Sequence, residues 1–182
     1  MSFGVAVFAL MAVWSLMTPL FSGPDEPSNF VRSAAVVRGE WVGDNVLPAP
    51  LKSYWTTTVN IDPQFGAANN IPWCFAPFSD RPGCGSRLED TQVTDIPAWT
   101  NMGRYPIASF FISGIGTVFG AQDLSVRAAR LMMSLACALL IALSVAAMKR
   151  RAASSSGVLL AVLPGTVFLA SMLRSYLRRC NT

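Results

Sequence analysis

The stretch FGVAVFALMAVWSLMTPLF, residues 3–21, contains no charged side chain. At about 1.5 Å per residue, a helix of this length approaches the roughly 30 Å thickness of a bilayer core. The rest of the chain is also apolar: of its 182 residues, 52% are hydrophobic and 13% are charged, and the mean hydropathy is +0.43. This composition is too apolar for an ordinary soluble domain and predicts an α-helical integral membrane protein.

The alternative for this first stretch is a cleaved signal peptide. A signal peptide has Lys or Arg before its apolar run and a cleavage site of the Ala-x-Ala type after it. Neither feature is present, and the helix-breaking pair Gly23-Pro24 follows directly. The sequence therefore favours a retained transmembrane helix over residues 1–22.

Charge is segregated along the chain, although the formal net charge is +4. Residues 23–104 hold nine acidic and six basic side chains, a net charge of −3, and the remainder holds one acidic and eight basic side chains. Basic residues do not gather into a patch with interleaved aromatic residues, which argues against nucleic acid as a partner. The acidic segment instead predicts one long polar loop between membrane helices.

Three apolar stretches follow the loop, at residues 105–120, 122–148 and 157–173. In the first, small or hydroxyl side chains lie on one side and large apolar side chains on the other at helical spacing, which is typical of a helix in the membrane interface. The second begins at Asp123, a predicted N-cap, and continues without charge to Met148 after two arginines. We expect about three spanning helices, at 1–22, 122–148 and 157–173, and one interfacial helix.

The orientation follows from Lys149-Arg150-Arg151, a basic triplet in a predicted short loop over residues 149–156. Such a loop is cytoplasmic under the positive-inside rule. The N-terminus is then cytoplasmic, residues 23–104 are extracytoplasmic, and the protein is a multi-pass protein of the cell membrane. If residues 105–120 also spanned the bilayer, the acidic loop would be forced inside. The basic tail 174–182 is atypical in this scheme, because it would lie outside.

Two of the four cysteines, Cys74 and Cys84, lie in the polar loop. The two prolines and the glycine between them favour a turn that brings the ends together, and a disulfide is expected in an oxidising compartment. Zinc is the alternative, but the chain has no histidine and no second cysteine pair. The sequence therefore predicts a structural disulfide and no metal bound through sulfur.

A short amphipathic helix is predicted over residues 26–38, directly after the first span. Asp25 is placed to cap it, Pro27 lies in its first turn and Gly39 ends it. Capping alone accounts for the carboxylate of Asp25. The functional alternative is that this carboxylate, at the outer membrane face near a helix N-terminus, stays ionised and accepts a proton from a sugar or polyol hydroxyl.

Arg127 and Arg130 lie one turn apart at the entrance of the second span. At the same interface as Asp25, they could bind a lipid-linked phosphate, since guanidinium groups match phosphate oxygens. The alternative is that they only extend their charged ends toward the lipid headgroups.

Four landmarks, together covering most of the chain up to about Ser171, resemble in their order a bacterial family of membrane proteins, domain of unknown function 2142 (DUF2142). They are GPDEPSNF (23–30), CFAP (74–77) with Cys84, GRYP (103–106) and LPGTVFLAS (163–171).

That family in turn resembles the GT-C class of glycosyltransferases, which use polyprenyl-phosphate sugars. The resemblance implies that Asp25 orients or deprotonates the acceptor hydroxyl, and that Glu26 lies on the acceptor or metal side. It implies the lipid bilayer, a polyprenyl-phosphate sugar and a cell-envelope glycan acceptor as partners, and leaves a divalent cation open as a cofactor.

Two departures limit this transfer of function. Asn29 stands where the family commonly has a histidine, and the residues after Ser171 do not continue into the Asn-Pro-rich loop of the family. They predict a truncated or frameshifted chain that is inactive by itself because helices that hold the lipid are missing. The alternative hypothesis is a small non-catalytic membrane protein whose outer loop binds a partner.

Overall fold

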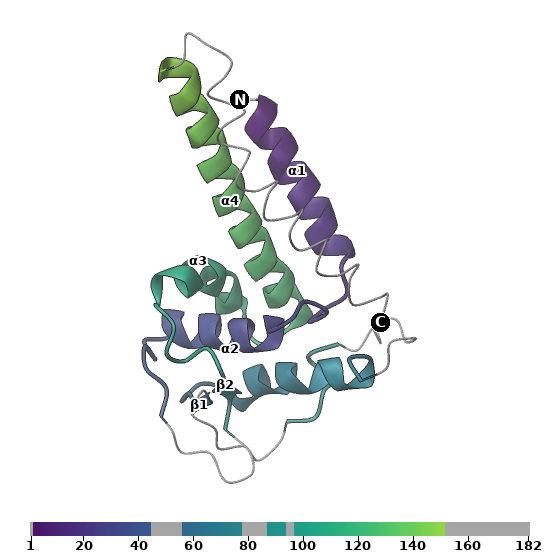
Figure 1. Cartoon of the computed structure of the whole chain (residues 1–182). Coiled ribbons are helices and arrows are strands. Elements are labelled where there is room, and N and C mark those ends of the chain that lie inside the picture. Colours follow the sequence, from purple (N-terminus) through teal and green to yellow (C-terminus); the bar gives the residue numbers. More distant parts are fainter. Residues whose placement is uncertain (1, 45–55, 78–86, 94–96, 152–182) are drawn as a thin grey trace, which may run out of the picture.

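A computed structural model describes residues 2–44, 56–77, 87–93 and 97–151. This part of the chain is mostly helical: two helices project from a folded body formed by the other elements (Figure 1). The elements are α1 (Ser2–Met17), α2 (Glu26–Val37), β1 (Thr57–Thr58), the 3₁₀ helix η1 (Pro63–Cys74), β2 (Trp99–Thr100), α3 (Ala108–Gly116), the 3₁₀ turn η2 (Thr117–Phe119) and α4 (Asp123–Arg151).

The two projecting helices, α1 and α4, pack side by side (Figure 1). They run antiparallel, because Gly4 lies against Ala142 whereas the Ser15 hydroxyl lies 3.2 Å from the Ser134 hydroxyl, nearer the body. A Cβ at Gly4 would come within 2.9 Å of the Ala142 Cβ, so the glycine permits the close approach of the two helices.

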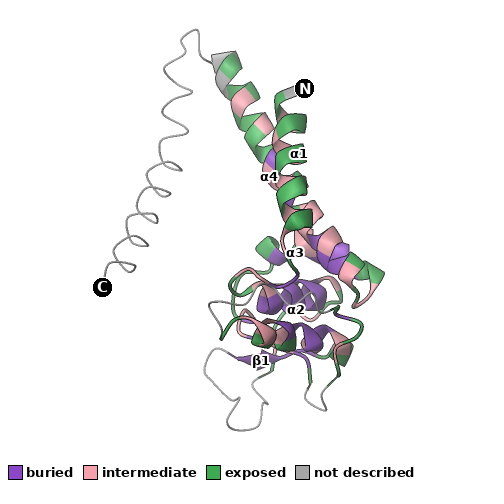
Figure 2. Cartoon of the chain, turned by 90° about the vertical axis from the view of Figure 1, so that its right-hand side faces the viewer, coloured by how far each residue is buried: buried purple, intermediate pink, exposed green. Residues whose placement is uncertain are grey.

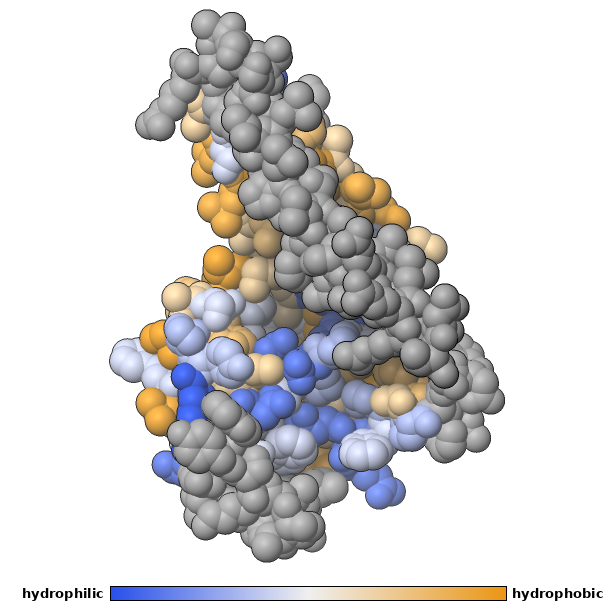
Figure 3. All heavy atoms as spheres, in the orientation of Figure 1, coloured by the Kyte–Doolittle hydropathy of each residue, from blue (hydrophilic) through white to orange (hydrophobic). Residues whose placement is uncertain are grey.

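Among the described residues, one helix has the length and composition to cross a bilayer: Asp123–Ala147, with a mean hydropathy of 2.0 over its most apolar window. Phe3–Met17 and Ala108–Phe119 are shorter apolar helices. Large apolar side chains gather on the projecting helices, whereas polar ones gather on the body (Figure 3). This distribution is what a protein in contact with lipid requires.

The first helix is shorter than the predicted span over residues 1–22, since α1 ends at Met17. Thr18 turns its hydroxyl back to the Trp14 carbonyl at 2.7 Å, and Pro19 cannot continue the helical hydrogen bonding. Leu20 and Phe21 are buried in the core of the body, where the Phe21 ring lies 5.5 Å from that of Phe30. The last apolar residues of the stretch therefore belong to the body.

The predicted amphipathic helix over residues 26–38 is present as α2, but most of its residues are buried on all sides and it has no broad face exposed to solvent. It packs against α3 on one side and η1 on another, and buried residues occur around nearly its whole circumference (Figure 2). Phe30 and Ala34 face the main core, and Val31 and Ala35 face a second apolar cluster with Val59. The helix is therefore the centre of the body.

The long loop predicted over residues 23–104 is in fact part of a folded body. β1 and β2 pair antiparallel in the register Thr57↔Thr100, and an isolated bridge joins Asp44 to Thr58. At the start of η1, the Asp62 side chain accepts a hydrogen bond from the Gln64 N–H at 2.9 Å. These short elements enclose the side of α2 that faces away from α3.

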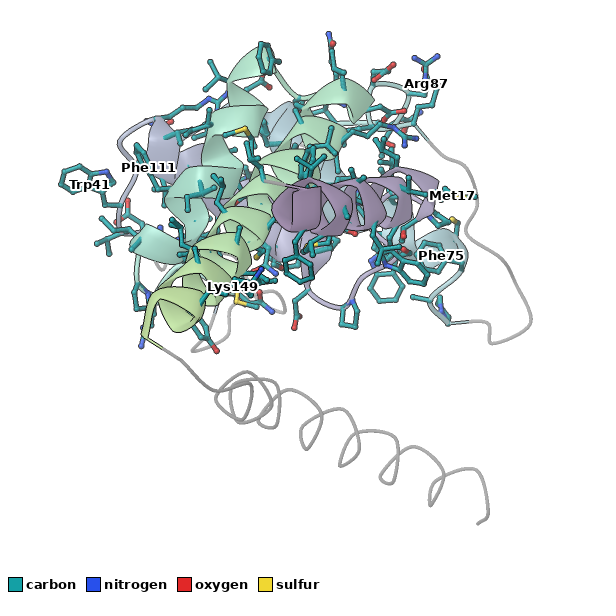
Figure 4. All side chains as sticks on the ribbon, turned by 90° about the horizontal axis from the view of Figure 1, so that it is seen from above. Met17, Trp41, Phe75, Arg87, Phe111 and Lys149 are labelled. Carbon is teal, nitrogen blue, oxygen red and sulfur yellow. The ribbon has the colours of Figure 1, made fainter. Side chains whose placement is uncertain are left out.

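The start of α4 is held by the segment 87–93. The helix begins at Asp123 as expected, but the Asp123 carboxylate accepts the Leu88 N–H at 2.7 Å, so the prediction that it caps its own helix is corrected. The Asp123 N–H donates to Glu89 at 3.2 Å, which lowers the pKa of Glu89, and the neighbouring Arg87 lowers it further. Arg87 lies on the opposite side of the body from Trp41 and Phe111 (Figure 4).

At its other end α4 continues through Lys149 to Arg151, so the basic triplet assigned to a loop over residues 149–156 is helical. The predicted span over 157–173, the tail 174–182 and Cys84 lie outside the described residues.

Two glycines of α3 permit close packing, and Gly116 is one of the small residues predicted to lie along one side of this helix. A Cβ at Gly114 would lie 2.6 Å from the Ser33 carbonyl oxygen of α2. A Cβ at Gly116 would lie 2.5 Å from the carbonyl carbon of Ala128 and 2.6 Å from the Ala129 Cα, both in α4. The small residues therefore bring α3 against the backbones of two other helices.

Gly116→Ala should destabilise the protein by about 2 kcal/mol, because backbone atoms of α4 cannot move aside as a flexible side chain could. Helix propensity alone predicts the opposite sign, a gain of up to about 1 kcal/mol. Thermal unfolding in one detergent measures the difference. Gly23→Ala is the control, since its new Cβ would make an ordinary 3.5 Å contact with Glu26. A higher midpoint for Gly116→Ala would contradict the packing described.

Candidate functional site

Arg130 of α4 joins the end of α1 to the start of α2. Its Nε and Nη2 donate to the two carboxylate oxygens of Glu26 at 2.6 and 2.9 Å. Its remaining N–H groups reach the carbonyl oxygens of Ser15 at 2.8 Å, Thr18 at 2.7 Å and Pro19 at 2.7 Å. A guanidinium has five N–H donors, and each of them has an acceptor here. No donor of Arg130 is left for a phosphate in this arrangement.

This arrangement answers a structural need of α1. The last carbonyl groups of a helix receive no hydrogen bond from N–H groups of the same helix. The helix dipole also gives this end a partial negative charge. α1 carries no basic residue in its last turn. Arg130 and Arg127 of α4 supply the missing donors and positive charge, the latter through one hydrogen bond from Nη1 to the Leu16 carbonyl at 2.8 Å.

Arg127 differs from Arg130 in how many of its hydrogen-bond donors are used. The bond to Leu16 is its single hydrogen bond to described residues, and its side chain is half-buried. The two arginines, which the sequence presented as an equivalent pair, therefore have different surroundings. Of the two, Arg127 has N–H donors that make no hydrogen bond to the described part of the chain and that suit an anion.

Glu26 is held firmly in place. Besides Arg130, its Oε2 accepts the Gly23 N–H at 3.3 Å, and its side chain is 21% exposed. The residue that the resemblance placed on the acceptor or metal side is therefore the partner of an arginine. Among the described residues, no group of three or more His, Cys, Asp or Glu side chains could hold a metal ion.

Asp25 has a different environment from Glu26. It occupies the N-cap position of α2, but its side chain makes no capping hydrogen bond, so the predicted capping by the carboxylate is corrected. The backbone accounts for this: Asp25 has φ +59°, in the left-handed region, whereas a residue whose side chain caps a helix typically has a β-region backbone. Its carbonyl oxygen accepts the Asn29 N–H at 2.9 Å, and its side chain is exposed.

An open cavity of about 390 Å³ lies beside this junction, between α2, α3 and α4. Glu26 and Arg130 form part of its wall together with Asn29, the position where the resemblance expected a histidine. The other lining residues are Phe30, Ser33, Ser109, Phe110, Ser113, Val126, Ala129 and Met133. The cavity has the size of a small-molecule site.

Arg32 of α2 and Arg38, which directly follows α2, have roles that the sequence did not indicate. Arg32 is fully buried and donates to the carbonyl oxygens of Trp41 at 2.7 Å, Glu40 at 3.3 Å and Tyr105 at 3.4 Å. Burial lowers its pKa. Arg38 donates to the Thr117 carbonyl at 2.8 Å. These two arginines therefore bind backbone carbonyl groups of other segments and hold the body together. For Arg32, a charged residue within an apolar helix was the available signal.

The pairing of Cys74 with Cys84 remains a prediction, because Cys84 lies outside the described residues. Cys137 is a free thiol within α4 and is half-buried.

Comparison with known families gives one match. The model of the family described as a predicted membrane protein (DUF2142) matches residues 8–175, slightly further than the resemblance reached. Comparisons with curated proteins and with solved structures gave no match. The family match covers α1 from residue 8, the body and α4 in one continuous stretch, in agreement with the apolar pair of helices. The chain belongs to the DUF2142 family of predicted membrane proteins.

Proposed function

We propose that this chain is the N-terminal part of a membrane glycosyltransferase-like protein of the GT-C type, which transfers sugar from a polyprenyl-phosphate donor to a cell-envelope glycan at the outer membrane face. Asp25 is the acidic residue that orients or deprotonates the acceptor hydroxyl. Because the lipid phosphate is a good leaving group, one carboxylate is sufficient for this chemistry.

The observation that supports this role is the contrast between two adjacent carboxylates. Glu26 is bound by Arg130, whereas Asp25 is exposed and is held in a left-handed backbone conformation. Phe21 and Asp25 are the two non-glycine residues with positive φ in the described part of the chain, and they flank the turn after α1. Such conformations occur where the surrounding structure imposes them, often at functional sites.

In this proposal the Arg130–Glu26 pair holds the turn that carries Asp25 in position. Arg130 and Glu26 fix the turn relative to the end of α1. Arg127 binds the phosphate of the donor with the N–H groups that have no acceptor among the described residues. The proposed phosphate site therefore contains Arg127 but not Arg130. The partners are the bilayer, a polyprenyl-phosphate sugar and a glycan acceptor.

The proposed topology places this turn outside the cell. α1 and α4 both cross the membrane, α3 lies in the interface and the N-terminus is cytoplasmic. Exposed apolar side chains on both long helices, such as Trp14 at 76% and Leu140 at 65%, support contact with lipid. Phe111 and Ile115 of α3 are exposed as well, and α3 lies on the side of the body nearest the two helices (Figure 1).

Because the chain is expected to be inactive by itself, the test of this function is sugar transfer in native membranes by the full-length protein of which we propose it is the N-terminal part, compared with the Asp25→Asn variant of that protein. The donor is a radiolabelled polyprenyl-phosphate sugar. Loss of transfer with normal insertion supports the proposal. Retained transfer removes Asp25 from the chemistry and favours the non-catalytic alternative, a membrane protein whose outer body binds a partner.

A further inference from the structure

The cavity between α2, α3 and α4 has a polar side and an apolar side. Asn29, Ser109, Ser113 and the Glu26–Arg130 pair contribute polar groups. The apolar side is formed by Phe30, Phe110, Val126, Ala129 and Met133. A ligand that fills this space therefore has both a polar and an apolar part.

The charges in the cavity wall favour a neutral polar group. Arg130 uses all its N–H donors on Glu26 and on carbonyl groups of the α1 end, so an anion would find a neighbouring carboxylate and no free guanidinium donor. A cation would have to approach Arg130 while competing with it for Glu26. Both signs of charge are disfavoured by the closed ion pair.

The remaining polar groups match hydroxyl groups. No hydrogen bond joins the Asn29 side chain to another described residue, so its amide offers two donors and an acceptor. Ser33 and Ser113 bond to each other at 2.7 Å, and Ser109 donates to the Pro106 carbonyl at 3.0 Å. These hydroxyls keep lone pairs that can accept hydrogen bonds. Amide donors together with hydroxyl acceptors suit a ligand with hydroxyl groups, each of which both donates and accepts.

The apolar side leads along α4. Met133 lies one turn beyond Arg130, farther from the start of α4 at the body, and its side chain is 37% exposed. Beyond it, α4 exposes Leu139, Leu140 and Leu143, within the helix long enough to cross a bilayer. An apolar chain leaving the cavity past Met133 would therefore enter the lipid phase without crossing water.

From this geometry we infer that the cavity binds the neutral, hydroxyl-bearing headgroup of a membrane amphiphile, with its acyl chain running past Met133 along α4. The class is that of a monoacylglycerol. This inference rests on the cavity and on membrane contact, and does not depend on sugar transfer.

The test uses the whole protein in phosphatidylcholine nanodiscs with two photoreactive probes. One is a monoacylglycerol with a diazirine in its acyl chain, and the other is the lysophosphatidic acid with the same chain. We expect saturable labelling of α3 and α4 peptides by the first probe, and labelling weaker by about ten-fold by the second. Equal or stronger labelling by lysophosphatidic acid, or no saturable labelling by either probe, would overturn the inference.

Two variants localise the binding. Asn29→Leu should reduce labelling by removing the free amide, and Met133→Trp should reduce it by filling the apolar side. Asn60→Leu, at an exposed asparagine of the body, is the matched control and should label like wild type. Met133→Trp at a partly exposed position keeps the test decisive if Asn29→Leu does not fold. Wild-type labelling of a folded Met133→Trp protein would contradict the site.

A competition arm separates membrane amphiphiles from soluble polyols, which share the same hydroxyl chemistry. Unlabelled monoacylglycerol should protect the cavity, whereas glycerol at the same concentration should not. Equal protection by glycerol would assign the cavity to a soluble ligand and refute the amphiphile.

Discussion

In the full-length protein, Asp25→Asn should lower sugar transfer by about 100-fold or more, the contribution typical of a positioned general base. Asn has nearly the same shape as Asp and also tolerates the left-handed backbone region, so the turn at φ +59° should survive the change. The substitution then removes the negative charge and the proton acceptor and little else. Transfer of radiolabelled sugar in native membranes, normalised to the amount of inserted protein, measures the effect.

The matched control for Asp25→Asn is Asp90→Asn, which removes another exposed carboxylate of the body. It should leave transfer unchanged. If both variants transfer at the wild-type rate, Asp25 is only a turn residue. If both lose transfer equally, the effect comes from general surface charge.

Arg130→Met should destabilise the protein by about 3 kcal/mol, at the lower end of the range for breaking a buried ion pair, because the Arg130 side chain is 12% and that of Glu26 21% exposed. The variant leaves the Glu26 carboxylate without its partner and removes three donors from the carbonyl groups that end α1. Thermal unfolding in one detergent, followed by circular dichroism, measures this loss.

Two further variants separate the ion pair from general effects of removing an arginine. Arg127→Met loses one described hydrogen bond and should cost about 1 kcal/mol. The double variant Glu26→Leu with Arg130→Met should be more stable than Arg130→Met alone, because no unpaired carboxylate remains. Equal midpoints for Arg127→Met and Arg130→Met would contradict the role of Arg130 as the joint between α1, α2 and α4.

Local signals in the sequence predicted several helices well. The proline at the second position and the following glycine located α2, which was expected over 26–38 and spans Glu26–Val37. The start of α4 at Asp123 and a helix within 105–120 also agreed with the expected positions. These features depend on residues close together in the chain, where helix propensity, caps and periodicity act.

Contacts between distant residues were not predictable in this way. The end of the first span was placed too late because Leu20 and Phe21 are as suitable for lipid as for a protein core. Arg130 meets Glu26 across more than a hundred residues of sequence, and nothing local distinguishes it from Arg127. The partner of the Asp123 carboxylate was not predictable either, because this carboxylate accepts the N–H of Leu88 from another segment and does not cap its own helix.

The central claim is that the body carrying Asp25 lies outside the cell, joined to a pair of membrane-spanning helices that return to the cytoplasm. A membrane-impermeant maleimide applied to intact cells tests this arrangement with two variants that each gain one cysteine, Asn60→Cys in the body and Lys149→Cys at the far end of α4. Both positions are exposed. In both variants Cys137 and Cys180 are replaced by serine. We expect labelling at position 60 in intact cells, and at position 149 only after the membrane is permeabilised. Labelling at position 149 but not at position 60 in intact cells would contradict this account.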